Sequence, residues 1–162
     1  MRKYGLMISF SIFIFIFVLC LLAAGDSRKS GKASAGPVPD KAYMQKVLDG
    51  WSTLDPSDAA KFYAAGPGTF FDITPLEYSS WEDYEAGVRK VVANYQSIKF
   101  ALNNDAVVHA EGDCAWGTAT IKEDALLKSG KRELATLRWT VIWEKRDVKW
   151  LIVHDHTSEP LQ

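Results

Sequence analysis

Two histidines near the C-terminus are spaced so that both could act at one site. His154 and His156 lie two residues apart in an apolar, β-branched segment, so a strand would place both imidazoles on the same face. Imidazole can act as a general base or as a metal ligand. A metal would need a third ligand, and no H-x-x-x-H, C-x-x-C or clustered carboxylate motif accompanies the pair. We therefore predict no metal, and expect the rings either to hydrogen-bond structurally or to contact a ligand at a pocket wall.

A carboxyl group in an apolar setting is the best candidate for acid–base chemistry. Asp72 lies inside the aromatic and β-branched run at 69–74 (TFFDIT). An isomerase-like mechanism needs such a base beside a hydrogen-bond donor, and Tyr63, Tyr78 or Tyr84 could supply the donor. The alternative is that Asp72 only caps or pairs at the end of a strand.

Aromatic residues indicate a pocket for an apolar or aromatic molecule. The chain has six Trp and six Tyr, whose large rings either line a wide pocket or fill the core. The residues predicted to contact a ligand are Tyr63, Asp72, Tyr78, Trp116, Trp139, His154 and His156.

Other classes of function lack their signatures. The sequence has no G-x-S-x-G motif, phosphate loop or dinucleotide fingerprint, so we predict no cofactor. Nineteen Lys and Arg against twenty Asp and Glu give a net charge of −1. Without a basic excess, we expect no nucleic-acid partner.

The spacing of apolar residues predicts an α+β domain that positions these groups. Helices are expected after Asp40, after Asp55-Pro56 and after Ser80, which has Asp83 in capping-box position. From Ser97 the apolar period changes to two, which is typical of strands. Strands are expected at 69–74, at 97–103 and 106–111 as one interrupted strand, and at 114–123, 133–145 and 150–157. Helices followed by hairpin-linked strands predict a curved antiparallel sheet with the helices on one face.

The last two expected strands can be aligned across a turn at Arg146-Asp147. This register pairs Trp143 with Trp150, Val141 with Ile152, Trp139 with His154, Leu137 with His156, and Arg138 with Asp155 as an ion pair on the opposite face. Neither face is fully polar, so each needs a cover. We predict that the helices cover one face and that a second subunit covers the other, giving a homodimer through the outer sheet face.

The N-terminal segment indicates export. A basic start, an apolar run at 6–22 and small residues up to Gly25 are typical of a signal peptide cleaved after Gly25. The alternative is an uncleaved membrane anchor. The apolar run is close to the length of about 20 residues that a bilayer-spanning helix needs. Residues 1–25 are thus predicted to be a signal peptide or anchor, 26–39 a flexible linker and 40–162 the folded domain. The domain is expected to be secreted or periplasmic, or held outside the cytoplasm by the anchor as its only membrane contact.

The closing hairpin resembles that of a known superfamily. The residues that carry the resemblance are Trp143-Glu144-Lys145-Arg146-Asp147, Lys149-Trp150, Val153-His154-Asp155-His156-Thr157-Ser158 and Pro160. They are similar to the W-x-x-x-D-G-K-W-x-I/V-x-H-x-H-x-S ending of nuclear transport factor 2-like (NTF2-like) domains. The likeness is greatest to the SnoaL-like and ketosteroid-isomerase-like branch and to the calcium/calmodulin-dependent protein kinase II association domain. Val148 replaces the usual Gly of the pattern.

The resemblance implies a cone-shaped α+β barrel that encloses a pocket and often dimerises through its outer sheet face. It does not imply one activity, since the fold hosts isomerases, cyclases, dehydratases and assembly modules. Our leading hypothesis is an exported domain that binds a small apolar or aromatic molecule. The alternatives are a cofactor-free isomerase, cyclase or hydro-lyase that uses Asp72 with a Tyr or His partner, and a homo-oligomeric assembly module.

Overall fold

The computed structural model describes residues 36–73 and 76–161. The signal peptide or anchor predicted at 1–25 therefore lies outside the described residues. The helices are α2 (Lys41–Trp51), α3 (Ser57–Ala60) and α4 (Trp81–Val92). The strands are β1 (Pro67–Phe71), β2 (Tyr78–Ser80), β3 (Tyr95–Leu102), β4 (Val107–Glu111), β5 (Cys114–Leu127), β6 (Arg132–Arg146) and β7 (Lys149–Ser158). Over this part of the chain, no helix combines the length and apolarity that a membrane span requires.

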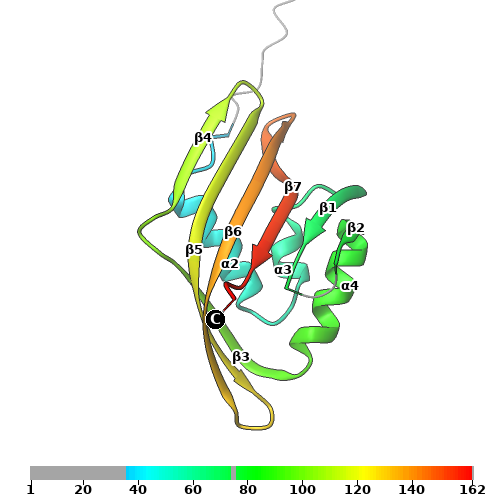
Figure 1. The fold of residues 1–162 in the computed structure, drawn as a ribbon. Helices are drawn as coiled ribbons and strands as arrows, with labels where there is room; N and C mark the ends of the chain where they lie inside the picture. The colour runs from blue at the N-terminus through cyan, green and yellow to red at the C-terminus, as the bar shows by residue number, and fades with distance from the viewer. Residues whose placement is uncertain (1–35, 74–75, 162) are drawn as a thin grey trace, which may run out of the picture. The chain divides into compact units, whose positions relative to one another are not determined.

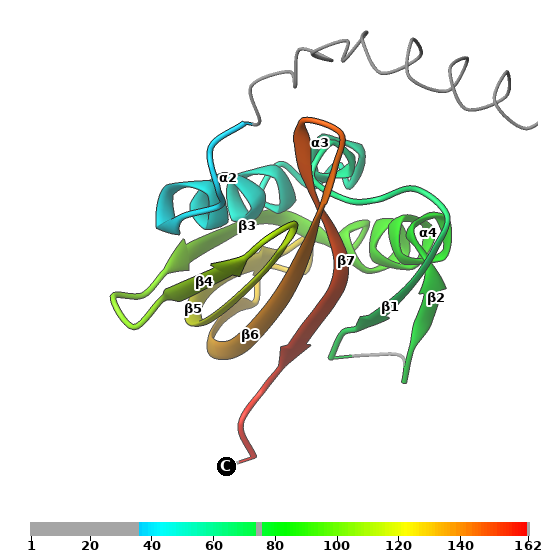
Figure 2. The same ribbon diagram turned by 90° about the horizontal axis from the view of Figure 1, so that it is seen from above.

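The strands form one curved, unclosed sheet in the order β2-β1-β7-β6-β5-β3, and β4 also pairs with β5 (Figure 1). The helices lie on one face of this sheet (Figure 2), so the predicted α+β class is confirmed. Strand β2 and the parallel pairing of β1 with β7 were not predicted. Both join the loop segment before α4 to the edge of the sheet.

Two helices begin where their capping residues predict. The side chain of Asp40 accepts a hydrogen bond from the backbone N–H of Tyr43 at 2.7 Å, and that of Ser80 accepts one from the N–H of Asp83 at 3.1 Å. Each bond satisfies a donor that the first helical turn leaves free. Helix α3 is only one turn long, shorter than its apolar spacing predicts.

The register of the β6–β7 hairpin differs from the predicted one. Arg146 pairs with Lys149, so the turn is one residue later, and Trp143 faces Ile152 instead of Trp150. The next paired position joins Ile142 to His154, which leaves one extra residue in β7. This residue, Val153, forms a β-bulge.

The bulge reverses the alternation of the rest of β7. Asp155 and Thr157 share the helix-covered face with Ile152, while His154 and His156 lie on the outer face. The predicted pairing of Trp139 with His154 is wrong, because Trp139 faces Thr157. Two further predicted pairs are wrong because the later turn and the bulge shift the register. Val141 faces Asp155 instead of Ile152, and His156 pairs with Thr140 instead of Leu137. The predicted ion pair is also wrong, because Arg138 faces Ser158 and donates to the backbone oxygen of Glu159.

Asp155 is a charged residue placed in the core. Its side chain is 1% exposed and accepts hydrogen bonds from Trp139 Nε1 at 2.7 Å and from the Tyr63 hydroxyl. Trp51 Nε1 in turn donates to the Tyr63 oxygen at 3.0 Å. Burial raises the pKa of Asp155 to about 7, against the lowering effect of the two donors.

This pKa makes the stability of the domain depend on pH. The folded state holds the Asp155 proton up to about pH 7, whereas the unfolded chain loses it near its usual pKa of 3.8. The free energy of unfolding should therefore fall as the pH rises from 4 to 7 and level off above 7. We predict that the free energy of unfolding of Asp155→Asn, which cannot ionise, rises relative to that of the wild type by about 2 kcal/mol as the pH goes from 5 to 7. Urea unfolding followed by tryptophan fluorescence measures the difference, and parallel pH curves for the two proteins would contradict it.

Candidate functional site

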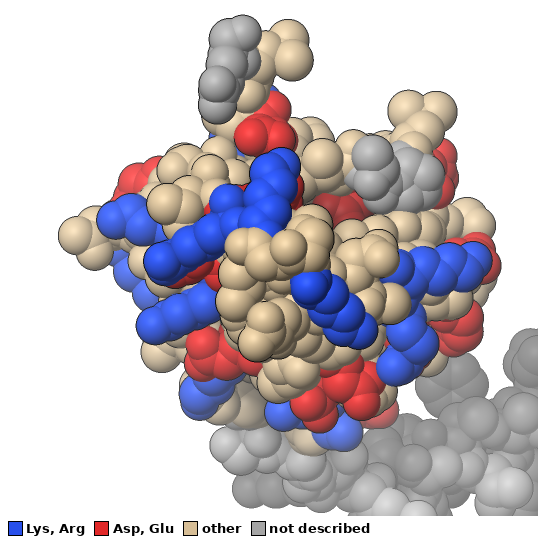
Figure 3. Space-filling view, turned by 90° about the horizontal axis from the view of Figure 1, so that it is seen from below, with Lys and Arg blue, Asp and Glu red and all other residues tan. Residues whose placement is uncertain are grey.

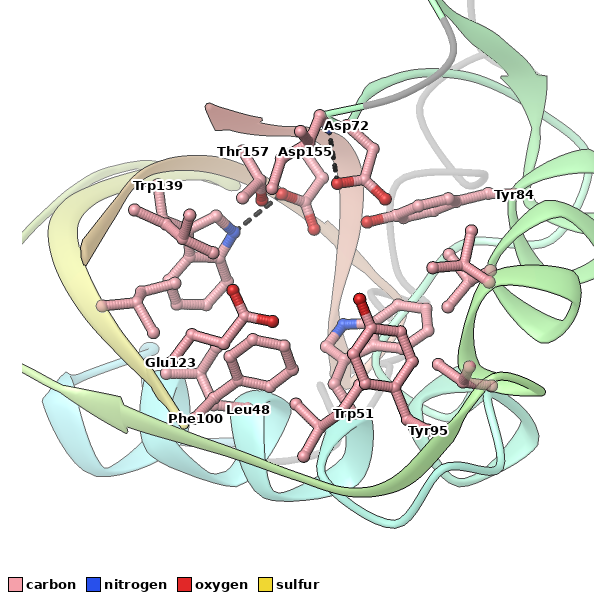
Figure 4. Close-up of a pocket in the computed structure, with 17 residues that line it drawn as sticks. Leu48, Trp51, Asp72, Tyr84, Tyr95, Phe100, Glu123, Trp139, Asp155 and Thr157 are labelled. Atoms are coloured by element: carbon pink, nitrogen blue, oxygen red, sulfur yellow. Dashed lines mark hydrogen bonds between the residues drawn. The ribbon is translucent and has the colours of Figure 1, made fainter. Parts of the chain in front are cut away.

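The helices and the inner face of the sheet form a cavity of about 220 Å³ that opens to the surface beside Ile73 and Val91 (Figure 4). Its wall is mainly aromatic and aliphatic: Leu48, Trp51, Ile73, Tyr84, Val88, Val91, Val92, Tyr95, Ile98, Phe100, Ile121, Leu137 and Trp139. Asp72, Glu123, Asp155 and Thr157 complete the lining. A mostly apolar wall with a few polar groups is typical of sites for small organic molecules.

Regular periodicity brings these side chains to the cavity. On α4, Tyr84 and Val88 are four residues apart and so lie on one helix face. On β5, Ile121 and Glu123 are two residues apart and point to the same side of the sheet. Asp155 reaches the cavity only because of the bulge at Val153.

Three carboxyl groups face the cavity from three different strands or strand ends. Asp72 and Asp155 lie at one end, and the Glu123 side chain points in from another wall (Figure 4). Burial raises the pKa of Asp72, whose carboxylate accepts a hydrogen bond from the backbone N–H of Ile73 at 2.8 Å. Burial also raises the pKa of Glu123, and the negative charges of neighbouring carboxylates add to this effect.

Tyr84 directs a hydroxyl group into the same cavity. The residue is 5% exposed, and its ring stacks on Phe70 with centroids 5.2 Å apart. Its hydroxyl points toward Asp72 (Figure 4). Burial and the nearby carboxylates of Asp155 and Asp72 raise its pKa well above the ordinary value, so it stays a neutral hydroxyl. Among the described residues, 36–73 and 76–161, no hydrogen bond involves the Tyr84 hydroxyl, whereas the hydroxyls of Tyr43, Tyr63 and Tyr95 each form one.

Of the residues predicted to contact a ligand, Asp72 and Trp139 line the cavity. Tyr63 lies behind it, bonded to Asp155. Tyr78 packs against Tyr84 with ring centroids 5.1 Å apart, but does not line the cavity.

The other three predicted contacts lie on the outer sheet face. Trp116 is 44% exposed and stacks on His109. His154 Nδ1 lies 2.8 Å from the backbone oxygen of Thr69, and His156 packs edge-on against Phe71. The positions of the two histidines fit the structural role that the sequence left open for them. None of the three residues lines the cavity.

Several lining residues were missed by the sequence analysis. Glu123 is in phase with the buried positions of β5, and an acidic residue at an inward position is a signal that could have found it. Asp155 has no such signal, since only the unpredicted bulge turns it inward. Trp51, at the end of α2, was not predicted as a site residue either.

Charge is distributed differently in the cavity and on the surface. No Lys, Arg or His is among the residues that line the cavity. On the face shown in Figure 3, basic and acidic side chains are interspersed. Within the described residues, no three His, Cys, Asp or Glu side chains are grouped so as to hold a metal ion.

Many solved structures have this fold: 231 chains match. An NTF2-like superfamily protein from Salmonella enterica is 19% identical, with a TM-score of 0.67 over 74% of this chain and 87% of that one. A Streptomyces avermitilis protein, named as a proposed dehydratase of the NTF2-like family, is 17% identical, with a TM-score of 0.64 over 74% and 92%. The association domain of calcium/calmodulin-dependent protein kinase II from C. elegans is 20% identical, with a TM-score of 0.58 over 72% and 90%.

These similarities are to the fold, and they match the NTF2-like architecture that the closing hairpin resembles. No curated protein matches the sequence. The family comparison is more specific, since the SnoaL-like domain pattern extends over residues 44–162 and includes every residue that lines the cavity. The chain therefore belongs to the SnoaL-like domain family, as its closing hairpin predicted.

Proposed function

We propose that this domain binds a small apolar or aromatic organic molecule in the cavity between its helices and its sheet. The observation that carries the proposal is a largely aromatic cavity into which the Tyr84 hydroxyl points, at the same end as the carboxyl group of Asp72. A hydroxyl group at this position can donate a hydrogen bond to a polar substituent of a ligand and accept one from it.

The volume of the cavity limits the size of the ligand. An apolar cavity of about 150 Å³ in another protein holds benzene, and this one measures about 220 Å³. One or two fused rings with a short polar substituent match this space.

The leader pattern at 1–25 supports a further proposal, that the domain meets its ligand outside the cytoplasm.

Acid–base catalysis is the second candidate function, and the perturbed carboxyl groups favour it. A group with a pKa of about 7, such as Asp155, can both accept and release a proton near neutral pH. Asp72 lies at the same end of the cavity as the Tyr84 hydroxyl (Figure 4), so Tyr84 is the partner we propose for it. A histidine partner finds no support, because His154 and His156 lie on the outer face.

The outer sheet face supports a proposal of homodimerisation. Two cross-strand rows run over β4, β5, β6 and β7, and their side chains carry no Asp, Glu, Lys or Arg. One row consists of His109, Trp116, Ile142 and His154, and the other of Val107, Thr118, Thr140 and His156. An extended uncharged face with an exposed tryptophan favours self-association.

Filling the cavity should abolish ligand binding. Val88→Phe adds a ring to a position that lines the cavity, and we predict at least about a tenfold loss of affinity for indole. A titration followed by NMR of the backbone amides measures it. Ala86→Phe is the matched control, since it adds the same ring to an exposed position of the same helix. Equal affinities of the two variants would contradict the proposed site.

If the cavity catalyses proton transfer, removing its base should stop the reaction. We predict that the wild type accelerates the exchange of the α-protons of 2-tetralone in D₂O, followed by proton NMR. Asp72→Asn should slow this exchange about 100-fold while it retains affinity for indole. An exchange rate equal to that of buffer would refute catalysis on this substrate type and leave the binding proposal standing.

A charge on the outer face should prevent dimerisation. We predict that the wild type sediments as a dimer at micromolar concentration and that Trp116→Glu sediments as a monomer, because an interface would have to bury the new carboxylate. Val148→Glu, in the β6–β7 turn, is the control and should leave the dimer intact. A wild-type monomer under these conditions would end the proposal.

A further inference from the structure

We infer that the cavity selects organic cations, so that its ligand is an aromatic or apolar molecule carrying a protonated amine. This inference rests on the proposed binding function and names the chemical class of its ligand. Three properties of the lining favour such a ligand: its charge, its hydrogen-bonding groups and its aromatic rings.

The cavity has acidic groups without a counter-charge. Asp72, Glu123 and Asp155 all line it, and no basic residue does. Six ion pairs connect the described residues, and none includes any of these three carboxyl groups. Burying unpaired carboxylates is unfavourable, and a cation bound between them would supply the missing charge.

Further acidic residues make the surroundings of Glu123 more negative. The negative charges of Glu133 and Glu159 act on its carboxyl group in addition to that of Asp72. No basic group of the described residues is among the charges that act on Glu123. The local potential therefore favours a positive ligand over a negative one.

The hydrogen-bonding groups of the lining are mostly acceptors. Two indole N–H groups come from lining residues, and both are occupied: Trp139 donates to Asp155 and Trp51 donates to Tyr63. The carboxyl groups of Asp72 and Glu123 and the Tyr84 oxygen remain as acceptors, whereas both oxygens of Asp155 already accept hydrogen bonds. An ammonium group offers three donors and no acceptor, which is the complement of this set. A carboxylate ligand, by contrast, would have hydroxyl groups such as that of Tyr84 as its donors and would lie beside the carboxyl groups of Asp72 and Glu123.

Aromatic rings line the same space. Trp51, Tyr84, Tyr95, Phe100 and Trp139 all contribute to the wall, and their positions around the cavity are visible in Figure 4. The faces of such rings attract cations, most strongly where water is excluded. Rings and carboxyl groups together favour a molecule that combines an aromatic body with a positive group.

Three ligands of one shape and different charge test this inference. Tryptamine is positive, tryptophol is neutral and indole-3-acetate is negative at pH 7.5. Isothermal titration of the purified full-length chain should give tryptamine an affinity about tenfold higher than tryptophol, with indole-3-acetate the weakest. Equal or tighter binding of tryptophol would overturn the inference and leave the proposed binding function intact. Binding of none of the three would overturn both.

Charge-removing variants separate a specific site from a general attraction. Glu123→Gln and Asp72→Asn should each bring the ratio of tryptamine to tryptophol affinity toward one, while the affinity for tryptophol is unchanged or higher. Glu111→Gln removes one negative charge at an exposed position of β4 and should leave the ratio at its wild-type value. A ratio that falls equally in all three variants would overturn the inference, because it would reflect only net charge.

Discussion

The carboxyl group of Asp155 connects three parts of the domain that are far apart in sequence. Trp139 on β6 and Tyr63 after α3 both donate to it, and Trp51 at the end of α2 donates to Tyr63. The same segment after α3 is held to β7 by backbone bonds, since Ile152 donates to Phe62 and Ala64 donates to Ile152. A buried carboxyl group whose acceptor positions are filled by indole and phenol donors fixes the helices against the sheet. The back wall of the cavity is therefore built around one polar network.

Stacked aromatic rings support the cavity wall around Tyr84. Tyr63 stacks on Trp81 with centroids 4.5 Å apart, and Phe70 stacks on Tyr84. Tyr78 lies so close to α4 that a Cβ atom at Gly87 would be 2.2 Å from its ring. A larger residue at this position would force the Tyr78 ring to shift, and in its present place this ring packs against that of Tyr84. Flat rings locked against one another cannot collapse into the remaining space as flexible side chains would.

Local signals in the sequence predicted the elements well, and long-range ones predicted the site only in part. Asp40 and Ser80 mark helix starts because capping is a contact within one turn. The strands follow from a period of two. The register of the last hairpin does not, since the extra residue at Val153 reverses the faces of every residue after it. Consequently the two histidines, which resemble site residues in the sequence, lie outside, and Asp155, which resembled half of a surface ion pair, lies inside.

A polar network of this kind opposes stability and favours chemistry for the same reason. Desolvation raises the pKa of Asp155 to about 7, so the folded domain holds a carboxyl group that changes its charge near neutral pH. Hydrophobic residues of similar volume would avoid this penalty. Asp72 shares the cavity and affects the ionisation of Asp155, Glu123 and Tyr84. Any ligand that enters therefore meets coupled acidic groups, and its own charge determines how many of them remain protonated. The binding and the proton transfer proposed for this cavity would thus both follow from one electrostatic arrangement.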